Sequence, residues 1–552
     1  MFENEIQRLI RKEARIKDIV LEVPSNPEFG DYAFPCFQLA KVQKRNPMEV
    51  ALELSEKMKP NEFIEKIVPK GPYVNFFIRR SYITELTLRS ILRMKEKYGS
   101  SFVGRGYNAL VEHTSINPNA SPHVGRARGA LIGDAMVRLL RFHGYEVEAH
   151  YFVNDIGKQI AMLVYAAGNK TPTFEGLLKF YIQANKKVKS SKKEEEKVFA
   201  LLRQLEQGDK PIRKKFKKIV EICVQGQKKI LSELGIKFEY FDYESEYLWN
   251  NALQDVIKKL ERTKKVFVDE FGRKVLDLKE FNLPMKCPVL VLTRNDGTSL
   301  YGLRDIAYNM DKAKKAKGKN LLVLGEDQKL YAQQVSAALS LLKVHPPEVV
   351  HFAFVTIAGG KMATRSGEVV LLEEFINEAV KKAKNELKKR KVAMNNKLSR
   401  DIGHGAVKYA ILKVSPEKNI AFDWDTALSF DGEAAPYIQY AHARASSIIR
   451  KAKIRTEQLN YTLIVSAEEM ALINKLYQFS SIAQKAGEEL RPHMIAVYAY
   501  QLAQEFNNFY HKCQVLTENE ELTKVRFAMV IATRQVLANA LSILGIAAPQ
   551  KM

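Results

Sequence analysis

The fold is decided by residues 108–153, NALVEHTSINPNASPHVGRARGALIGDAMVRLLRFHGYEVEAHYFV. The stretch begins with a strand pattern, NALVEHT, and continues through a loop rich in Asn and Pro into a helical pattern from about Gly125 to Phe142. A second strand pattern, EVEAHYFV, follows. This order of strand, helix and strand predicts a βαβ unit, which is the seed of a parallel sheet.

The same alternation returns further along the chain in PVLVLTRNDG, LLVLG and HFAFVTIAG, which we expect to be further strands of that sheet. Between the two parts, residues of about 166–286 are rich in Lys and Glu and predict a helical insertion. From about Glu373 onward the patterns predict helices alone. The first hundred residues predict a small α+β unit, with a helix to about Asp18, another from Pro47, and a strand in YVNFFI.

These patterns predict an α/β protein with a Rossmann-type parallel-sheet domain at residues 101–375, interrupted by the insertion at about 166–286. An N-terminal α+β domain is expected at residues 1–100, a helical connector at 376–428 and a helical C-terminal domain at 429–552. The length of 552 residues suits several domains.

The charge of the chain predicts a polyanionic partner. Lys and Arg number 87 against 63 Asp and Glu, which gives a formal net charge of +24. Such an excess favours binding to nucleic acid, because neutralised phosphates release their counterions. A generally Lys-rich surface is the alternative. The hydrophobic content of 46% excludes wholesale disorder.

Metal and membrane classes receive no support from the sequence. The four cysteines, Cys36, Cys223, Cys287 and Cys513, form no CxxC pair or Cys/His cluster, so we expect reduced thiols and no structural zinc. The N-terminal helix pattern is charged and lacks an apolar signal-peptide core, and no run of 18 apolar residues occurs. We therefore expect a cytoplasmic protein without a membrane partner.

Two loops carry the chemistry. His123, Gly125 and Arg126 follow the first strand at a helix start, where backbone amides and the helix dipole favour a phosphate. Ordinary helix capping is the alternative interpretation of this loop alone. A second glycine-flanked loop, GGKMATRSGEVV, places Lys361 and Arg365 after a later strand of the sheet. Two cationic loops at one sheet edge can hold a triphosphate from both sides.

The pairing resembles the HIGH and KMSKS loops of class I aminoacyl-tRNA synthetases, with HVGR at residues 123–126 and KMATR at residues 361–365. Arg126 stands in place of the second histidine, and the second lysine of KMSKS is absent, so Arg126 and Arg365 are expected to act as cationic substitutes. The resemblance implies catalytic roles for His123, Gly125, Arg126, Lys361 and Arg365.

Flanking motifs narrow the resemblance to the arginyl-tRNA synthetase family. In order they are VEHTSINPNASPHVGRARGALIGD, NDIGKQ, DGTSLYGLRDIAY, FDGEAAPYIQYAHARA, FNNFYHKCQVL and LGIAAPQKM. NPEFGDYAFP and GPYVNFF also resemble the additional N-terminal domain of that family, so the resemblance covers essentially the whole chain.

A pocket for arginine needs carboxylates and a hydroxyl that match the planar guanidinium group. Glu112, Tyr301 and Asp305 supply these groups, and Tyr301 and Asp305 share one face if their segment is helical. A surface carboxylate for Glu112 and a helix ion pair for Asp305 are the alternatives. The resemblance implies guanidinium contacts for these three residues, and contacts to the α-amino end of arginine for Asn117 and Gln328.

ATP contacts are expected from both loops and from the segment GEDQ, which follows an apolar strand and can approach the ribose. The expected ATP-binding residues are His123, Gly125, Arg126, Gly325, Asp327, Lys361 and Met362. Mg²⁺ is expected to arrive with the phosphates of ATP. The segment NDIGKQ suggests no sharp chemical role for Asp155 or Lys158, for which a structural role is equally consistent.

Aromatic residues in the helical C-terminal part are candidates for stacking on bases of a single-stranded RNA loop. The family uses this part for the anticodon loop, which implies tRNA contacts for Tyr437, Tyr440, Tyr510 and Met552. Core packing with a satisfied polar tip is the alternative. Tyr73 and Asn75 share one strand face in YVNF and match positions through which relatives contact the tRNA elbow, unless this is a half-buried edge strand.

The resemblance implies an arginine:tRNA ligase that forms arginyl adenylate and transfers arginine to the terminal adenosine of tRNA(Arg), with tRNA needed for activation. A monomer is expected. Two alternatives remain: a different class I synthetase, for which neither an editing insertion nor a zinc site is legible, and a noncatalytic tRNA-binding paralogue. The paralogue would bind tRNA without forming an adenylate.

Overall fold

The computed structural model describes residues 2–16, 18–24, 26–357, 370–392, 395–452 and 454–552. The chain forms two compact units, one of residues 1–98, 444–479 and 501–536, and one of residues 99–443, 480–500 and 537–552. No helix in the described part of the chain is both long and apolar enough to span a membrane.

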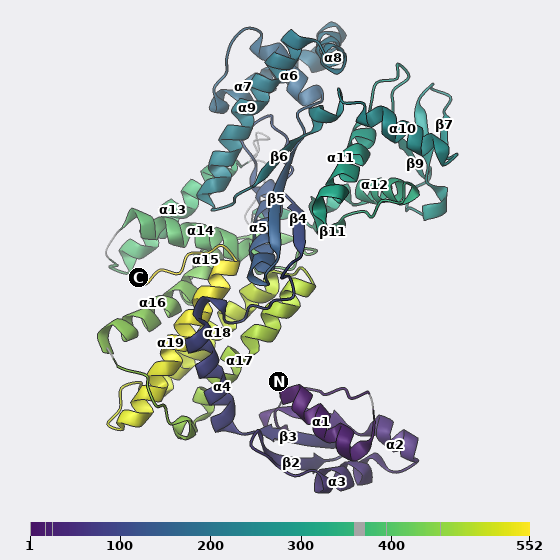
Figure 1. Ribbon diagram of the computed structural model, residues 1–552. Helices are drawn as coiled ribbons and strands as arrows, with labels where there is room; N and C mark the ends of the chain where they lie inside the picture. Colours follow the sequence, from purple (N-terminus) through teal and green to yellow (C-terminus); the bar gives the residue numbers. More distant parts are fainter. Residues whose placement is uncertain (1, 17, 25, 358–369, 393–394, 453) are drawn as a thin grey trace. The chain divides into compact units, whose positions relative to one another are not determined.

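The second unit is built on a five-stranded parallel sheet with the order β11-β10-β4-β5-β6 (Figure 1). Its strands are β4 (Asn108–Glu112), β5 (Glu146–Val153), β6 (Tyr240–Tyr243), β10 (Gly318–Gly325) and β11 (Glu348–Phe352). The chain moves from β4 outward through β5 to β6, and then returns to the other side of β4 to form β10 and β11. This is a doubly wound Rossmann topology, so the predicted fold class is confirmed.

Helix α5 (Val124–Phe142) joins β4 to β5 and packs against β4, β5 and β10. Its apolar side chains are buried along most of its length. At Gly133 a Cβ atom would lie 2.2 Å from Cγ of the buried His113, so only glycine permits this close approach between helix and sheet. Helix α11 (Tyr301–Ala316) contacts β4 and β10 and brings its polar residues to the same part of the sheet.

The predicted helical insertion is correct in its first half and wrong in its second. Residues 158–233 form α6 (Lys158–Ala167), α7 (Phe174–Ser190), α8 (Lys192–Glu206) and α9 (Lys210–Glu233), capped at their starts by Thr173, Ser191 and Asp209 for the last three. The next segment is β6, the edge strand of the parallel sheet. Its sequence YFDY lacks the apolar run of a buried strand, which explains why the pattern concealed it.

A separate antiparallel sheet of order β7-β8-β9 follows α10 (Ala252–Arg262). Its strands are β7 (Val266–Val268), β8 (Lys274–Asp277) and β9 (Val289–Val291). The segment PVLVL was expected in the parallel sheet, but it forms β9, which pairs only with β8 there. An apolar run of this length fits a strand in either kind of sheet, so the sequence could not decide between them.

β11 is followed by β12 (Val355–Ile357). From residue 370 onward, the regular elements of the described segments are helices apart from one short strand, β13 (Ile420–Phe422), which pairs with β12. The helices are α13 (Leu372–Lys389), α14 (Asn396–Leu412), α15 (Trp424–Ala427), α16 (Ala435–Ala452), α17 (Ala467–Glu488), α18 (His493–Lys512) and α19 (Glu520–Ile543). The helical prediction from Glu373 is therefore correct except at β13.

The N-terminal residues of the first unit form an antiparallel sheet of order β1-β3-β2, with strands β1 (Tyr32–Pro35), β2 (Ile64–Lys70) and β3 (Tyr73–Ile78). The accompanying helices are α1 (Phe2–Ala14), α2 (Phe37–Gln43), α3 (Pro47–Lys57) and α4 (Arg80–Met94). Helix α3 begins at Pro47, as predicted, with Asn46 capping it.

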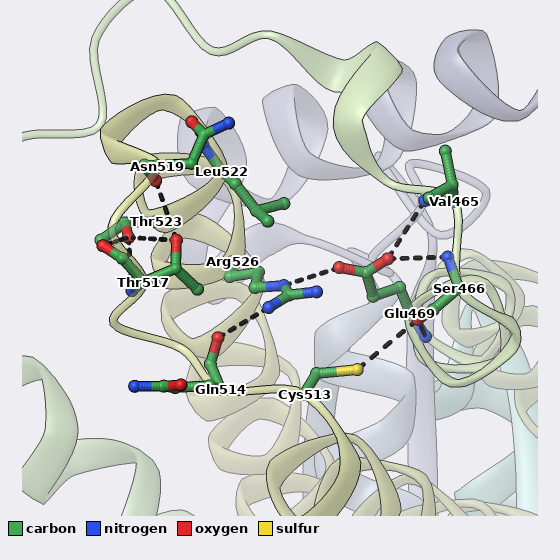
Figure 2. Close-up of polar contacts among 10 residues, drawn as sticks. All are labelled: Val465, Ser466, Glu469, Cys513, Gln514, Thr517, Asn519, Leu522, Thr523 and Arg526. Atoms are coloured by element: carbon green, nitrogen blue, oxygen red, sulfur yellow. Dashed lines mark hydrogen bonds and ion pairs between the residues drawn. The ribbon is translucent and has the colours of Figure 1, made fainter.

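In the helical part of this unit, one buried ion pair joins three segments (Figure 2). Glu469, which is 0% exposed, accepts hydrogen bonds from the backbone of Val465 and Ser466, and Ser466 in turn caps the amide of Glu469. Arg526 donates to Glu469 Oε1 at 2.7 Å and to the carbonyl of Gln514 at 2.7 Å. The carboxylate is thus fully satisfied, as a capping box with a cation added.

Candidate active site

The candidate active site is a cavity of about 320 Å³ at the carboxyl ends of β4 and β10. These strands are neighbours in the sheet, but the chain leaves them toward opposite sides, which makes this the switch point where doubly wound sheets bind ligands. Residues predicted from the sequence line it together: Glu112, Asn117, Arg126, Tyr301, Asp305, Gly325 and Gln328.

The histidine loop forms the start of α5. His123 is the N-cap residue, with extended backbone, yet its side chain makes no capping hydrogen bond. Its Nδ1 atom is buried and has no hydrogen-bond partner within the described residues. Burial, and then the nearby positive charge of Arg126, lowers the pKa of His123. The ring is therefore neutral near pH 7 and retains unused hydrogen-bonding capacity beside a helix N-terminus.

The start of α13 is tied to the start of α5. The amide of Val124 donates to the carbonyl of Val370 at 3.1 Å, and the amide of Leu372 donates to the carbonyl of Pro122 at 2.7 Å. Residue 370, where the described chain resumes, therefore lies beside the histidine loop. The predicted Lys361, Met362 and Arg365 lie outside the described residues.

Two carboxylates, Glu112 and Asp305, line the cavity, and the charge of a third, Glu244, acts on Asp305. Glu112 and Glu244 each have a cation of their own. Glu112, at the end of β4 and only 4% exposed, forms an ion pair with Lys312 of α11. Glu244, which follows β6, is paired with Arg304, and the guanidinium of Arg304 also donates to the carbonyl of Ser299. Both pairs are buried, so these charges are compensated inside the protein.

Asp305 is the third carboxylate, and its hydrogen-bond partner in the described structure is a phenol. The hydroxyl of Tyr331 in α12 (Lys329–Leu341) donates to Asp305 Oδ2. Burial, followed by the charge of Glu244, raises the pKa of Asp305 to about 7. A cation that entered the cavity would compensate this carboxylate and favour its ionised form.

The aromatic wall of the cavity comes from Tyr301 and Tyr331, whose ring centroids lie 4.9 Å apart. Tyr301 and Asp305 are both on α11, as the helical interpretation of their spacing required. Tyr301 remains 54% exposed, so its ring is available to a ligand. Asn117 donates to Gln159 Oε1 at 3.1 Å, and Gln328 donates to Asp327 at 3.4 Å.

Several residues that support the site escaped the sequence analysis. Lys312 and Tyr331 contact the predicted carboxylates directly, and Glu244 adds a third carboxylate. Gln227 of α9 is buried and donates to the carbonyls of Asn117 and Ala120, which fixes the loop before His123. Only Lys312 could have been found from the sequence, because it lies on the same predicted helix as Asp305. Tyr331, Glu244 and Gln227 come from distant segments of the chain.

The segment NDIGKQ has structural contacts of its own. Asp155 accepts hydrogen bonds from the amide and the hydroxyl of Ser245, and burial raises its pKa to about 6. Lys158 is paired with Glu195 of α8. These contacts join the end of β5 to the segment after β6 and to the insertion.

The residues expected to face RNA differ in their surroundings. Tyr440 is 39% exposed and Tyr510 is 40% exposed, with the guanidinium of Arg444 over the Tyr510 ring. Tyr437 packs against Tyr500. Met552 packs on the apolar cluster of α13, α14 and the segment around α15. His442 is buried and donates from Nδ1 to the carbonyl of Pro549 at 2.9 Å, which is a structural contact.

The expectation of one exposed face at Tyr73 and Asn75 is wrong for Asn75. This residue is 4% exposed, because β3 is the central strand of its sheet and is covered on the face that carries Asn75. The edge-strand alternative is wrong for the same reason. Tyr73 is partly exposed and its ring lies against Phe37, at a centroid distance of 5.7 Å.

The doubly wound sheet, with its histidine loop at the switch point, defines the catalytic domain of a class I aminoacyl-tRNA synthetase. Residues 87–424 match the family "tRNA synthetases class I (R), catalytic domain". Residues 1–78 match the "Arginyl tRNA synthetase N terminal domain", and residues 438–552 match the "DALR anticodon binding domain". The chain belongs to the arginyl-tRNA synthetase family.

Individual relatives agree over the full length. The arginine–tRNA ligase of Methanocaldococcus jannaschii is 38% identical, with 100% of this chain and 99% of the relative covered. That of Methanocella arvoryzae is 38% identical, with 94% and 92% covered. The structure of Thermus thermophilus arginyl-tRNA synthetase is similar, with a TM-score of 0.83, 28% identity and 100% of both chains covered.

Proposed function

We propose that this chain is an arginine–tRNA ligase whose cavity at the switch point binds L-arginine and ATP. The arginine carboxylate attacks the α-phosphorus of ATP, the new C–O–P linkage gives arginyl adenylate, and pyrophosphate leaves. The 2′-hydroxyl of the terminal adenosine of tRNA(Arg) then attacks the arginyl carbonyl, and AMP leaves. These steps require positioning and electrostatic stabilisation, so no protein nucleophile takes part.

One observation carries the choice of arginine: Asp305 is a largely buried carboxylate whose partner is a phenol, and the two carboxylates whose charges act on it already have cations. A guanidinium supplies the missing positive charge and the directed N–H groups that a carboxylate and a phenol can accept. Asp305 thus receives the guanidinium, with Glu112 and Tyr301 beside it. Asn117 and Gln328 contact the α-amino end of arginine.

The phosphates are assigned to the start of α5. His123, Gly125 and Arg126 stand at the helix N-terminus, where a developing negative charge is stabilised. Lys361, Met362 and Arg365 approach from the second loop, and Gly325 and Asp327 contact the ribose. Mg²⁺ accompanies the triphosphate as part of the ATP substrate.

The remaining parts of the chain are assigned to tRNA. Residues 1–100 contact the tRNA elbow through Tyr73, and residues 429–552 contact the anticodon loop through Tyr437, Tyr440, Tyr510 and Met552. Residues 101–375 form the catalytic domain and 376–428 the connector. The enzyme acts as a cytoplasmic monomer. Bound tRNA completes the site for arginine activation.

The experiment is exchange of labelled pyrophosphate into ATP, with each amino acid in turn, and with and without tRNA. We expect exchange with arginine only, and only when tRNA is present. Exchange with arginine in the absence of tRNA would retain the ligase and reject the requirement for tRNA. Protein that binds tRNA but gives no exchange under any condition would support the noncatalytic paralogue instead.

A further inference from the structure

The ion pair behind the cavity suggests a role that the site residues do not cover. Lys312 is 1% exposed and does not line the cavity, yet its ammonium group contacts Glu112, which does. A lysine is rarely buried so completely unless its charge has a function or a firm partner. Lys312 therefore acts on the ligand site from outside it, through its ion pair with Glu112 and through its position 5.2 Å from the ring centroid of Tyr308, which also lines the cavity.

The surroundings make the charge of Lys312 decisive. Glu112 and Asp305 lie close enough for the charge of Glu112 to act on Asp305. Two neighbouring carboxylates with little access to water do not both remain ionised without a cation, and one of them takes up a proton instead. Lys312 supplies the cation for Glu112, so the cavity retains a single uncompensated carboxylate.

Most other charged and titratable groups around this pair have partners within the described structure. They are Arg304 with Glu244, Tyr308 with Asp242, and Tyr331 with Asp305; Asp242 is also bonded to His150 of β5. Arg126 lines the cavity from α5. Burial, and then Glu112 and Asp242, raise the pKa of Tyr308, so this phenol stays neutral and cannot replace the lysine charge.

We propose that Lys312 is a positioning residue for arginine: its ammonium group compensates the charge of Glu112 and fixes that carboxylate in place, and leaves Asp305 as the single carboxylate for the substrate guanidinium to neutralise. This inference rests on the proposed function. Without the ammonium group, the empty cavity holds an additional proton at neutral pH, and arginine must displace that proton to bind.

The test is the pH profile of the arginine KM in pyrophosphate exchange with saturating tRNA, between pH 6.5 and 9. Lys312→Gln retains a hydrogen-bond donor and removes the charge. We expect its KM to exceed that of the wild type about tenfold at pH 7, because arginine must displace one additional proton when it binds. The ratio of the variant KM to the wild-type KM should fall as the pH rises, toward a constant that reflects only the lost contact between Lys312 and Glu112. The kcat should stay within about twofold of the wild-type value.

Three further variants isolate the charge. Lys312→Arg should restore a nearly normal KM, because the cation is retained. The matched control is Lys315→Gln on the same helix, since Lys315 is paired with the exposed Asp311, and its profile should equal that of the wild type. In the double variant Lys312→Gln/Glu112→Gln, the carboxylate that would take up the additional proton is absent. The KM is therefore raised by a factor that does not vary with pH.

A constant KM ratio for Lys312→Gln across the pH range would overturn the inference, as would a fall in kcat with an unchanged KM. If Lys312→Gln alone fails to fold, the double variant contains no unpaired buried charge, and a pH-dependent ratio in it would overturn the inference as well. Failure of the proposed function has a different signature, because the wild type would then show no arginine-dependent exchange.

Discussion

Two carboxylates, one in each unit, have very different surroundings. Glu469 accepts two backbone amides and an arginine, and this set holds three segments of the helical part together (Figure 2). Asp305 lies between two carboxylates that have their own cations, and its partner is the hydroxyl of Tyr331. A satisfied charge serves the fold, whereas an uncompensated one is available to a ligand.

The comparison teaches that burial of an ionisable group does not by itself mark a functional site. Structural ion pairs and binding sites both perturb titration. What separates them is whether the neighbourhood completes the charge and the hydrogen bonds. By that criterion Glu469 is a structural residue, and Asp305 is a candidate ligand-binding residue. The two residues should therefore respond to substitution in opposite ways.

The largest expected effect is on stability, from Glu469→Ala. The substitution leaves Arg526 without its carboxylate and removes the acceptor for the amides of Val465 and Ser466 at the start of α17, so we expect a loss of about 3 kcal/mol in the unfolding free energy. Denaturant unfolding followed by circular dichroism measures it. The neighbouring Glu468→Ala is the control, with a change of about 0.5 kcal/mol or less. An equally small change for Glu469→Ala would show that this ion pair does not stabilise the fold.

The next effect is on the chemical step, from His123→Ala. Because Nδ1 of His123 has no partner in the described structure, little stability is lost, while the hydrogen bond to the reacting phosphate disappears. We expect adenylate formation to fall by about 10²-fold with tRNA affinity intact. The rate of arginyl adenylate formation in a single-turnover experiment measures this effect. The control is His143→Ala, a buried histidine bonded to Ser101 and to the carbonyl of Ala483, which should lose stability instead.

Full activity of His123→Ala would remove this residue from the phosphate site. It would also show that an unpartnered polar atom at the start of α5 is insufficient to identify a functional group.

Local patterns explain how much the sequence could predict. The strands β4 and β5, the helix α5 between them and the start of α3 follow from periodicity and from Pro at a helix start, which depend on neighbouring residues alone. The edge strand β6 escaped because its four residues carry no apolar run. The location of PVLVL in β9 escaped because strand pairing depends on distant segments.

The site shows the same division. Glu112, Tyr301 and Asp305 were found as residue types that suit a guanidinium, and they do line one cavity. The sequence could not show that Glu112 is neutralised by Lys312 while Asp305 faces Tyr331, because those partners meet only in the folded chain. Asn75 shows a further limit of prediction from sequence. The alternation of residues in a strand places Asn75 on one face of the sheet but does not show whether other elements cover that face.

Asp305→Asn should give the opposite signature to Glu469→Ala. The amide keeps an oxygen for Tyr331 but carries no charge, so the protein should be as stable as the wild type or more so. The arginine KM should rise at least about tenfold, which corresponds to roughly 1.5 kcal/mol for a charged hydrogen bond. Steady-state exchange and thermal unfolding measure the two quantities. A normal KM would exclude Asp305 from the arginine pocket.

The smallest expected effect is the pH dependence of arginine binding in the wild type. With the pKa of Asp305 raised to about 7, the empty cavity holds a proton on this carboxylate below pH 7, and arginine must displace it. The KM for arginine should therefore be constant above about pH 7.5 and rise as the pH falls, approaching tenfold per pH unit. Asp305→Asn should abolish this slope. If the wild-type KM is constant between pH 6 and 8, Asp305 is already compensated in the free protein, and the contrast with Glu469 fails at its central point.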